Sequence, residues 1–143
     1  MKGQNPIILI PARLASTRLP DKPLAQICGL PMIVQVLKRA QEADCGRVVV
    51  AAAEAEIADA VESAGGEAIL TDPDLPSGSD RIHAALRMVD ADGRHDAIIN
   101  LQGDLPTLEP HLVKACLAAL AGADMSTLVA EITNEAERDN PNV

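Results

Sequence analysis

The chain has 143 residues, a length typical of one domain, and 48% of them are apolar, which is enough to build a core. It contains no Phe, Trp or Tyr, which excludes proteins that bind single-stranded nucleic acid by stacking bases on aromatic side chains. The net charge of −9 argues against a nucleic-acid partner and against an anionic membrane surface.

The charge is unevenly distributed along the chain. Residues 1–47 contain seven basic and three acidic side chains, whereas the other 96 residues contain five basic and eighteen acidic ones. A basic N-terminal part in an acidic protein indicates a small anionic ligand. The three cysteines are far apart and form no C-x-x-C pair, which predicts reduced thiols and a cytoplasmic location. We find no apolar run of membrane-spanning length and expect no signal peptide.

Apolar strand patterns alternate with helical patterns, which is typical of an α/β fold with a mostly parallel sheet. In chain order we predict a strand over 7–10, a loop over 11–31, a helix over 32–43 and a strand over 48–53. A helix over 54–64, a strand over 67–70 and a loop over 72–78 follow, and then a helix that is capped by Ser79 and runs to Val89. The remaining predicted elements are a strand over 97–101, a loop over 102–107, a helix ending at Ala121 and a last strand over 125–130. We expect residues 1–130 to form the ligand-binding part of a single domain and residues 131–143 a polar, poorly ordered tail.

The first loop reads I-P-A-R-L-A-S-T-R-L-P-D-K-P-L and contains three cations, Arg13, Arg18 and Lys22. It leaves the carboxyl end of the first strand, where open α/β sheets bind their ligands. Three cations there could wrap a triphosphate through charge-assisted contacts. The spacing matches neither G-x-x-x-x-G-K nor G-x-G-x-x-G, so an exposed basic loop without a ligand remains an alternative on spacing alone.

Two further segments carry candidate site residues. The segment N-L-Q-G-D-L-P follows a buried strand, so Asp104 could hold Mg²⁺ and Gly103 allows a close approach of the backbone. A lone Asp after a strand can also be a simple turn residue. The segment S-G-S-D-R, Ser77 to Arg81, begins a helix and could bind a sugar or base, or merely decorate the first turn.

The three segments, in this order, resemble the N-terminal part of the 3-deoxy-D-manno-octulosonate cytidylyltransferases, or CMP-Kdo synthetases. The resemblance covers nearly the whole chain and implies the three-layer α/β/α fold of the nucleotide-diphospho-sugar transferases. It implies the reaction of CTP with Kdo to give CMP-Kdo and diphosphate, with Mg²⁺, for lipopolysaccharide synthesis. By resemblance, the phosphate ligands of CTP are Arg13, Arg18 and Lys22, the cytidine-contacting segment contains Ser77, Ser79 and Arg81, the metal ligand is Asp104, and the residue facing the sugar acid is Gln102.

Several positions depart from the family pattern. Leu14 stands where the family typically has Tyr, Asp21 where it has Gly, and Leu105 where it has Glu. Ala52, Ala53 and Glu54 replace a more polar Thr-Asp-Asp stretch. Family members also continue well beyond Val143, so we expect this chain to be a fragment or a truncated product. The part beyond Val143 resembles the source of a second metal aspartate, of most sugar contacts and of a homodimer interface.

Three alternatives remain open from the sequence. The chain could belong to another sugar-acid nucleotidyltransferase, such as a CMP-sialic acid synthetase, because the half that would select the sugar lies outside it. It could also be a CTP-binding module without catalysis, or a scaffold without any ligand.

Overall fold

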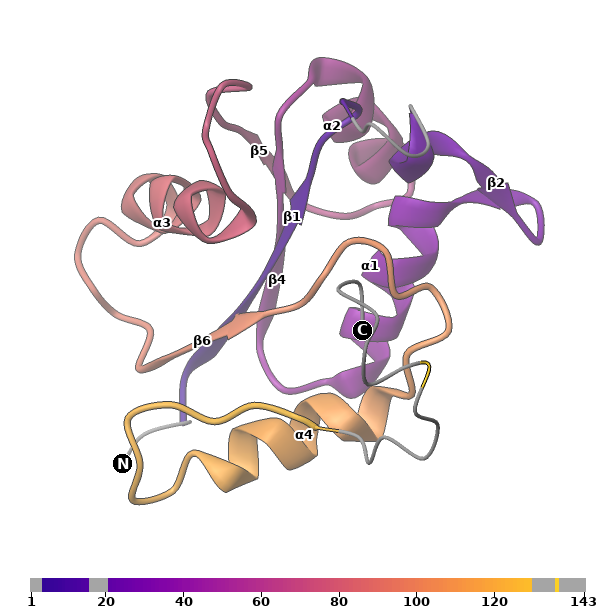
Figure 1. The fold of residues 1–143 in the computed structure, drawn as a ribbon. Helices are drawn as coiled ribbons and strands as arrows, with labels where there is room; N and C mark the ends of the chain where they lie inside the picture. Colours follow the sequence, from indigo (N-terminus) through magenta and orange to yellow (C-terminus); the bar gives the residue numbers. More distant parts are fainter. Residues whose placement is uncertain (1–3, 16–20, 130–135, 137–143) are drawn as a thin grey trace.

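The computed structural model describes residues 4–15, 21–129 and 136. Its centre is a sheet of four parallel strands in the spatial order β5-β4-β1-β6 (Figure 1). The strands are β1 (Pro6–Ala12), β4 (Arg47–Ala52), β5 (Ala68–Leu70) and β6 (Ala97–Asn100). The mostly parallel α/β sheet expected from the sequence is therefore confirmed.

Helices cover both faces of this sheet, as Figure 1 shows. Alternate side chains of a strand point to opposite faces, and β1 is buried on both. Ile8 and Ile10 of β1 join one core cluster with α1 and α2, whereas Ile7 and Leu9 join a second cluster with Ile82 of α3. The helices are α1 (Met32–Ala43), α2 (Ala55–Ser63), α3 (Gly78–Val89) and α4 (Pro110–Ala119). The result is the three-layer α/β/α arrangement that the sequence predicts.

The predicted bounds of the first helix, 32–43, are confirmed. Its apolar residues recur every three or four positions, and Ile33, Val36, Leu37 and Ala40 are all almost completely buried. This amphipathic pattern extends over the full helix, so sequence alone places both ends.

The prediction of one loop over 11–31 is wrong in its second half. That half contains a short 3-10 helix, η1 (Lys22–Leu24), and an antiparallel hairpin of β2 (Gln26–Ile27) and β3 (Leu30–Pro31). Strands of two residues are too short to show an alternating apolar pattern. The turn residues Cys28 and Gly29 have φ of 51° and 84°, the left-handed backbone that a two-residue type I′ hairpin turn requires.

We predict that Cys28→Asn raises the free energy of unfolding by about 0.5–1 kcal/mol, because asparagine tolerates the left-handed backbone better than most residues. Urea unfolding checks this value. Cys28→Ser is the matched control: it also removes the thiol but lacks this conformational preference. A gain of the same size in the serine variant would contradict the explanation.

Two other expectations need correction. Ser77, and not Ser79, is the N-cap of α3, because the Ser77 side chain accepts the backbone N–H of Asp80. Residues 125–129 form no strand, and Met125 and Val129 are largely exposed. Apart from Ala136, the predicted tail 131–143 lies outside the described residues.

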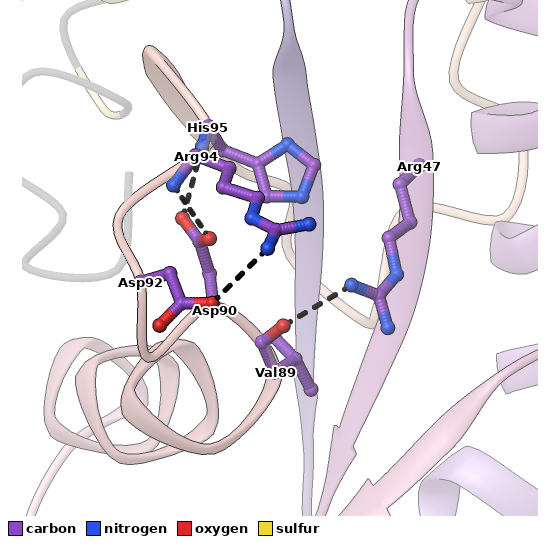
Figure 2. Close-up of polar contacts among 6 residues, drawn as sticks. All are labelled: Arg47, Val89, Asp90, Asp92, Arg94 and His95. Atoms are coloured by element: carbon purple, nitrogen blue, oxygen red, sulfur yellow. Dashed lines mark hydrogen bonds and ion pairs between the residues drawn. The ribbon is translucent and has the colours of Figure 1, made fainter.

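The end of the sheet opposite the strands' carboxyl ends is braced by polar contacts (Figure 2). The Asp90 carboxylate, after α3, accepts the backbone N–H groups of His95 and Arg94 at 3.0 and 2.7 Å. These two hydrogen bonds, His95 first, hold the pKa of Asp90 below its ordinary value. The two hydrogen bonds therefore stabilise the folded state fully at a pH above the ordinary pKa of an Asp side chain. This stabilisation is lost as the pH falls through the lowered pKa of Asp90. Arg47 donates to the carbonyl oxygen of Val89 at 3.2 Å.

Within the described ranges, we find no helix that is long and apolar enough to cross a membrane. The three cysteines are free thiols.

Candidate active site

A pocket of about 330 Å³ opens at the carboxyl ends of β1 and β6. In this sheet the chain proceeds from β1 outward to β4 on one side and later to β6 on the other, so the two strands flank the point where the strand order reverses. Ligands of open α/β sheets bind at such points. Six of the eight sequence-predicted site residues line the pocket: Arg13, Lys22, Ser77, Arg81, Gln102 and Asp104.

The other two predicted residues differ in their placement. Ser79 is the second residue of α3 and is not among the residues that line this pocket. Arg18 lies outside the described residues.

Two loops meet through a pair of opposite charges. Lys22 Nζ lies 3.4 Å from the carboxylate Oδ2 of Asp104, so the loop after β1 and the loop after β6 face each other across the pocket. The two side chains are 40% and 54% exposed. Exposed pairs of this kind contribute about 0–1 kcal/mol, so an incoming anion or cation can separate them at little cost.

Gly103 allows the loop after β6 to approach β1 closely, as the sequence suggests. A Cβ atom at this position would lie 2.7 Å from the carbonyl oxygen of Pro11, which is backbone and cannot turn aside. Just before it, Leu101 donates its N–H to the carbonyl oxygen of Leu9 at 3.1 Å. The close approach places Gln102 and Asp104 at the pocket.

Arg81 is a buried cation that makes hydrogen bonds at the start of the loop between β5 and α3. Its guanidinium donates to the hydroxyl of Thr71 at 2.6 Å and to the carbonyl oxygen of Asp72 at 2.9 Å. Burial lowers the pKa of Arg81, opposed by the negative charges of Glu54 and Asp72 and assisted by the positive charge of Arg13. Arg81 therefore holds the start of the loop over 72–77 through these hydrogen bonds, and it also lines the pocket.

Ser77 and Asp80 fix the start of α3 beside the pocket. The Ser77 hydroxyl accepts the N–H of Asp80 at 3.1 Å and donates to the Asp80 carboxylate at 2.5 Å. The N-terminal end of a helix carries a partial positive charge and unpaired N–H groups, which favour oxygen-rich ligands. Both this end and the pocket cations therefore suit an anion.

The pocket offers one side chain that suits a hard divalent cation as a ligand. Among the described residues that line the pocket, Asp104 is the one carboxylate. No cluster of three or more His, Cys, Asp or Glu side chains that could hold a metal is found among the described residues. Mg²⁺ is usually held by one or two carboxylates together with phosphate oxygens and water, so Asp104 suits a metal that arrives with a phosphate ligand.

Glu54 makes a further contact of the site that the sequence motifs do not show. The carboxylate Oε2 of Glu54 accepts the backbone N–H of Leu14 at 3.0 Å, next to Arg13. The available signal was positional: Glu54 closely follows β4, the neighbour of β1, so it lies at the same edge of the sheet.

Comparison with known proteins identifies the family. The family described as Cytidylyltransferase matches residues 7–143, nearly the whole chain. This chain belongs to the cytidylyltransferase family. The resemblance seen in the sequence motifs is thereby confirmed.

Several curated relatives of this chain share one name. Proteins named 3-deoxy-manno-octulosonate cytidylyltransferase are 67% identical in Parvibaculum lavamentivorans and 62% identical in Rhodospirillum centenum, over 97% and 98% of this chain. The matched part is 55% of each of those proteins. The chain thus spans about half the length of the curated relatives it matches.

Solved structures agree with the fold of this chain. CMP:2-keto-3-deoxy-manno-octonic acid synthetase, solved in complex with CTP, has a TM-score of 0.77 and 39% identity over 82% of this chain and 48% of the other. A nucleotidyl transferase from Methanothermobacter thermautotroptrophicus has a TM-score of 0.66 at 18% identity, over 81% of this chain and 58% of the other, and supports the fold alone.

Proposed function

We propose that this chain is the CTP-binding part of a 3-deoxy-manno-octulosonate cytidylyltransferase. The observation that carries the proposal is the pocket between β1 and β6, where Arg13, Lys22 and Asp104 come together from two separate loops. Support comes from the names of the relatives and from the CTP complex of the 39% identical synthetase.

Within this proposal each pocket group has a role. Arg13, Lys22 and Arg18 bind the triphosphate through charge-assisted contacts, and the Ser77–Arg81 segment, including Ser79, receives the cytidine. Gln102 faces the sugar acid. Asp104 is the residue that would hold Mg²⁺, and the metal would supply positive charge at the phosphates.

The proposed reaction is an in-line displacement. The anomeric hydroxyl oxygen of Kdo forms a bond to the α-phosphorus of CTP, the bond from that phosphorus to the diphosphate breaks, and the hydroxyl proton passes to solvent water. Lys22 and the arginines favour this step because they stabilise charge that grows on the transferring and leaving phosphates. The chain contributes positioning and electrostatics, with no covalent intermediate on the protein.

The test uses the 143-residue chain itself. Calorimetric titration with CTP and Mg²⁺ should show binding, and Lys22→Ala should weaken it. Assays of diphosphate release with Kdo should show no sustained turnover, because the described pocket lining contains a single carboxylate and the chain spans about half of its relatives. Absence of CTP binding would overturn the proposal.

The same assay in the whole protein separates related functions. Release of diphosphate with Kdo but not with sialic acid supports the proposed substrate, whereas the reverse assigns the sialic acid. Binding without release of diphosphate with either sugar assigns a CTP-binding module.

We place the enzyme in the cytoplasm because three free thiols suit a reducing compartment. The expected homodimer of the whole protein stays a prediction.

Asp21 should oppose CTP binding. It is exposed, lies directly before Lys22 and has a left-handed backbone, with φ of 60°. Asp21→Gly removes a charge that repels the triphosphate and suits this backbone, so it should tighten CTP binding about two- to tenfold at low salt and less at high salt.

Asp21→Asn is the matched control because it removes the charge and still tolerates the backbone. It should give most of the gain of the glycine variant at low salt. Equal CTP affinities of wild type and both variants at low salt would show that Asp21 does not oppose the nucleotide.

A further inference from the structure

The loop that carries the pocket cations is closed at its base by hydrogen bonds to one backbone residue, Leu14. The N–H of Leu14 donates to Glu54 Oε2 at 3.0 Å, and the carbonyl oxygen of Leu14 accepts the N–H of Asp21 at 3.0 Å. Arg13 directly precedes Leu14, and Lys22 directly follows Asp21. The two hydrogen bonds, which we call the neck, therefore fix the positions of two pocket cations relative to each other.

The neck is attached to the sheet on both sides. The side chain of Leu14 packs against the main core cluster. The backbone ladder between β1 and β4 extends to Ala53, whose N–H donates to the carbonyl oxygen of Ala12 at 2.9 Å. Glu54 follows directly, so its carboxylate starts from a fixed point of the backbone.

Glu54 uses its carboxylate for the neck rather than for its own helix. It occupies the N-cap position of α2 with an extended backbone, φ −129° and ψ 151°, yet its side chain makes no capping hydrogen bond. The carboxylate contacts a residue 40 positions earlier in a half-buried setting. A charged acceptor in such a place makes a stronger hydrogen bond than a neutral one, so the contact is well suited to hold a loop.

Two effects of Glu54 on an anionic ligand oppose each other. Its negative charge near the pocket repels phosphates, whereas its hydrogen bond orders the cations that attract them. Repulsion alone predicts that removal of the charge tightens binding, and ordering predicts that removal of the acceptor weakens it.

We propose that Glu54 is a positioning residue for triphosphate binding: it closes the neck at Leu14 and thereby holds Arg13 and Lys22 at the pocket. The proposal rests on the proposed function for the identity of the nucleotide, and it concerns the phosphate end of that ligand.

The variants separate the acceptor from the charge. Glu54→Gln keeps an acceptor oxygen and loses the charge, whereas Glu54→Asp keeps the charge but is one methylene too short to reach Leu14. Glu54→Ala loses both. Glu56→Ala is the matched control because it removes an exposed carboxylate from the first turn of the same helix.

The first measurement compares calorimetric affinities for CTP, inorganic triphosphate and cytidine in the 143-residue chain. We expect Glu54→Ala and Glu54→Asp to bind CTP and triphosphate about tenfold more weakly, the effect of one lost charged hydrogen bond, with cytidine affinity unchanged. Glu54→Gln and Glu56→Ala should stay close to wild type. A tighter CTP complex in both the Ala and Gln variants, or an equal loss for CTP and cytidine, would overturn the proposal.

The second measurement needs no ligand. In hydrogen exchange, the amides of Leu14 and Asp21 should lose protection in Glu54→Ala and keep it in Glu54→Gln, with α2 unaffected. Unchanged protection in Glu54→Ala would overturn the neck. The two proposals can fail separately. If the wild type binds inorganic triphosphate but not CTP, and triphosphate binding weakens in Glu54→Ala, the proposed function is overturned and the role of Glu54 stands.

Discussion

Replacing Asp104 by asparagine should change CTP binding in opposite directions with and without Mg²⁺. In the structure the Asp104 carboxylate pairs with Lys22 Nζ at 3.4 Å, so without metal it competes with the phosphates for this cation. Its removal should then tighten CTP about two- to fivefold, in keeping with an exposed ion pair. With Mg²⁺ the variant lacks a metal ligand and should bind about tenfold more weakly or worse.

Lys22→Ala is the comparison that isolates this effect. It removes a direct phosphate cation, so CTP binding should fall about 10- to 100-fold under both conditions. In the Lys22→Ala background, Asp104→Asn should no longer tighten metal-free binding. Calorimetry on the four proteins of this cycle, with EDTA and with Mg²⁺, gives the eight affinities that it needs. Weaker metal-free binding of Asp104→Asn would show that the carboxylate acts on the nucleotide by another route.

Gly103→Ala should lower both stability and metal-dependent CTP binding. The new Cβ would lie 2.7 Å from the carbonyl oxygen of Pro11, so the loop after β6 must move away from β1. Overpacking of this kind costs about 1–3 kcal/mol, which corresponds to a fall in Tm of about 3–10 °C for a chain of this length. The movement displaces Asp104, so CTP affinity in Mg²⁺ should fall about tenfold, whereas metal-free affinity should change much less.

Gly78→Ala is the control for the stability part. Its Cβ would lie 3.4 Å from the Cγ atom of the Pro11 side chain, an ordinary contact, and alanine is the better helix residue at the start of α3. Its Tm should not fall. An unchanged Tm for Gly103→Ala would show that the loop after β6 has room that the geometry does not suggest.

The predictable parts of this fold are those with periodic burial. The buried strands and α1 carry apolar residues at regular spacing, and their positions follow directly from it. The position of the β2–β3 hairpin does not follow from the sequence, because strands of two residues show no apolar period. Its turn also has Cys28 where Asn is usual. The cap at Ser77 does have a local signal, because Asp80 follows it by three positions, a spacing of Ser and an acidic residue that is typical of a helix N-terminus.

The candidate site divides in the same way. The motifs placed six residues at the pocket because each lies just beyond a strand or at a helix start, and parallel strands bring these ends together. The pairing of Lys22 with Asp104 and the contact of Glu54 with Leu14 depend on loop shape over separations of 82 and 40 residues. The position of a residue after a strand places it at this edge of the sheet, but a single sequence does not show which of the atoms gathered there meet.

The position of β6 at the border of the sheet has a practical consequence for the purified chain. In the part of the chain that the structure describes, no strand pairs with its outer side, and the side chain of Ile98 is 50% exposed. Free N–H and C=O groups beside an apolar side chain can pair with another molecule. Concentrated samples should therefore self-associate, and Ile98→Lys, which places a charge on that border at a residue that does not line the pocket, is the substitution to make first if titrations show aggregation.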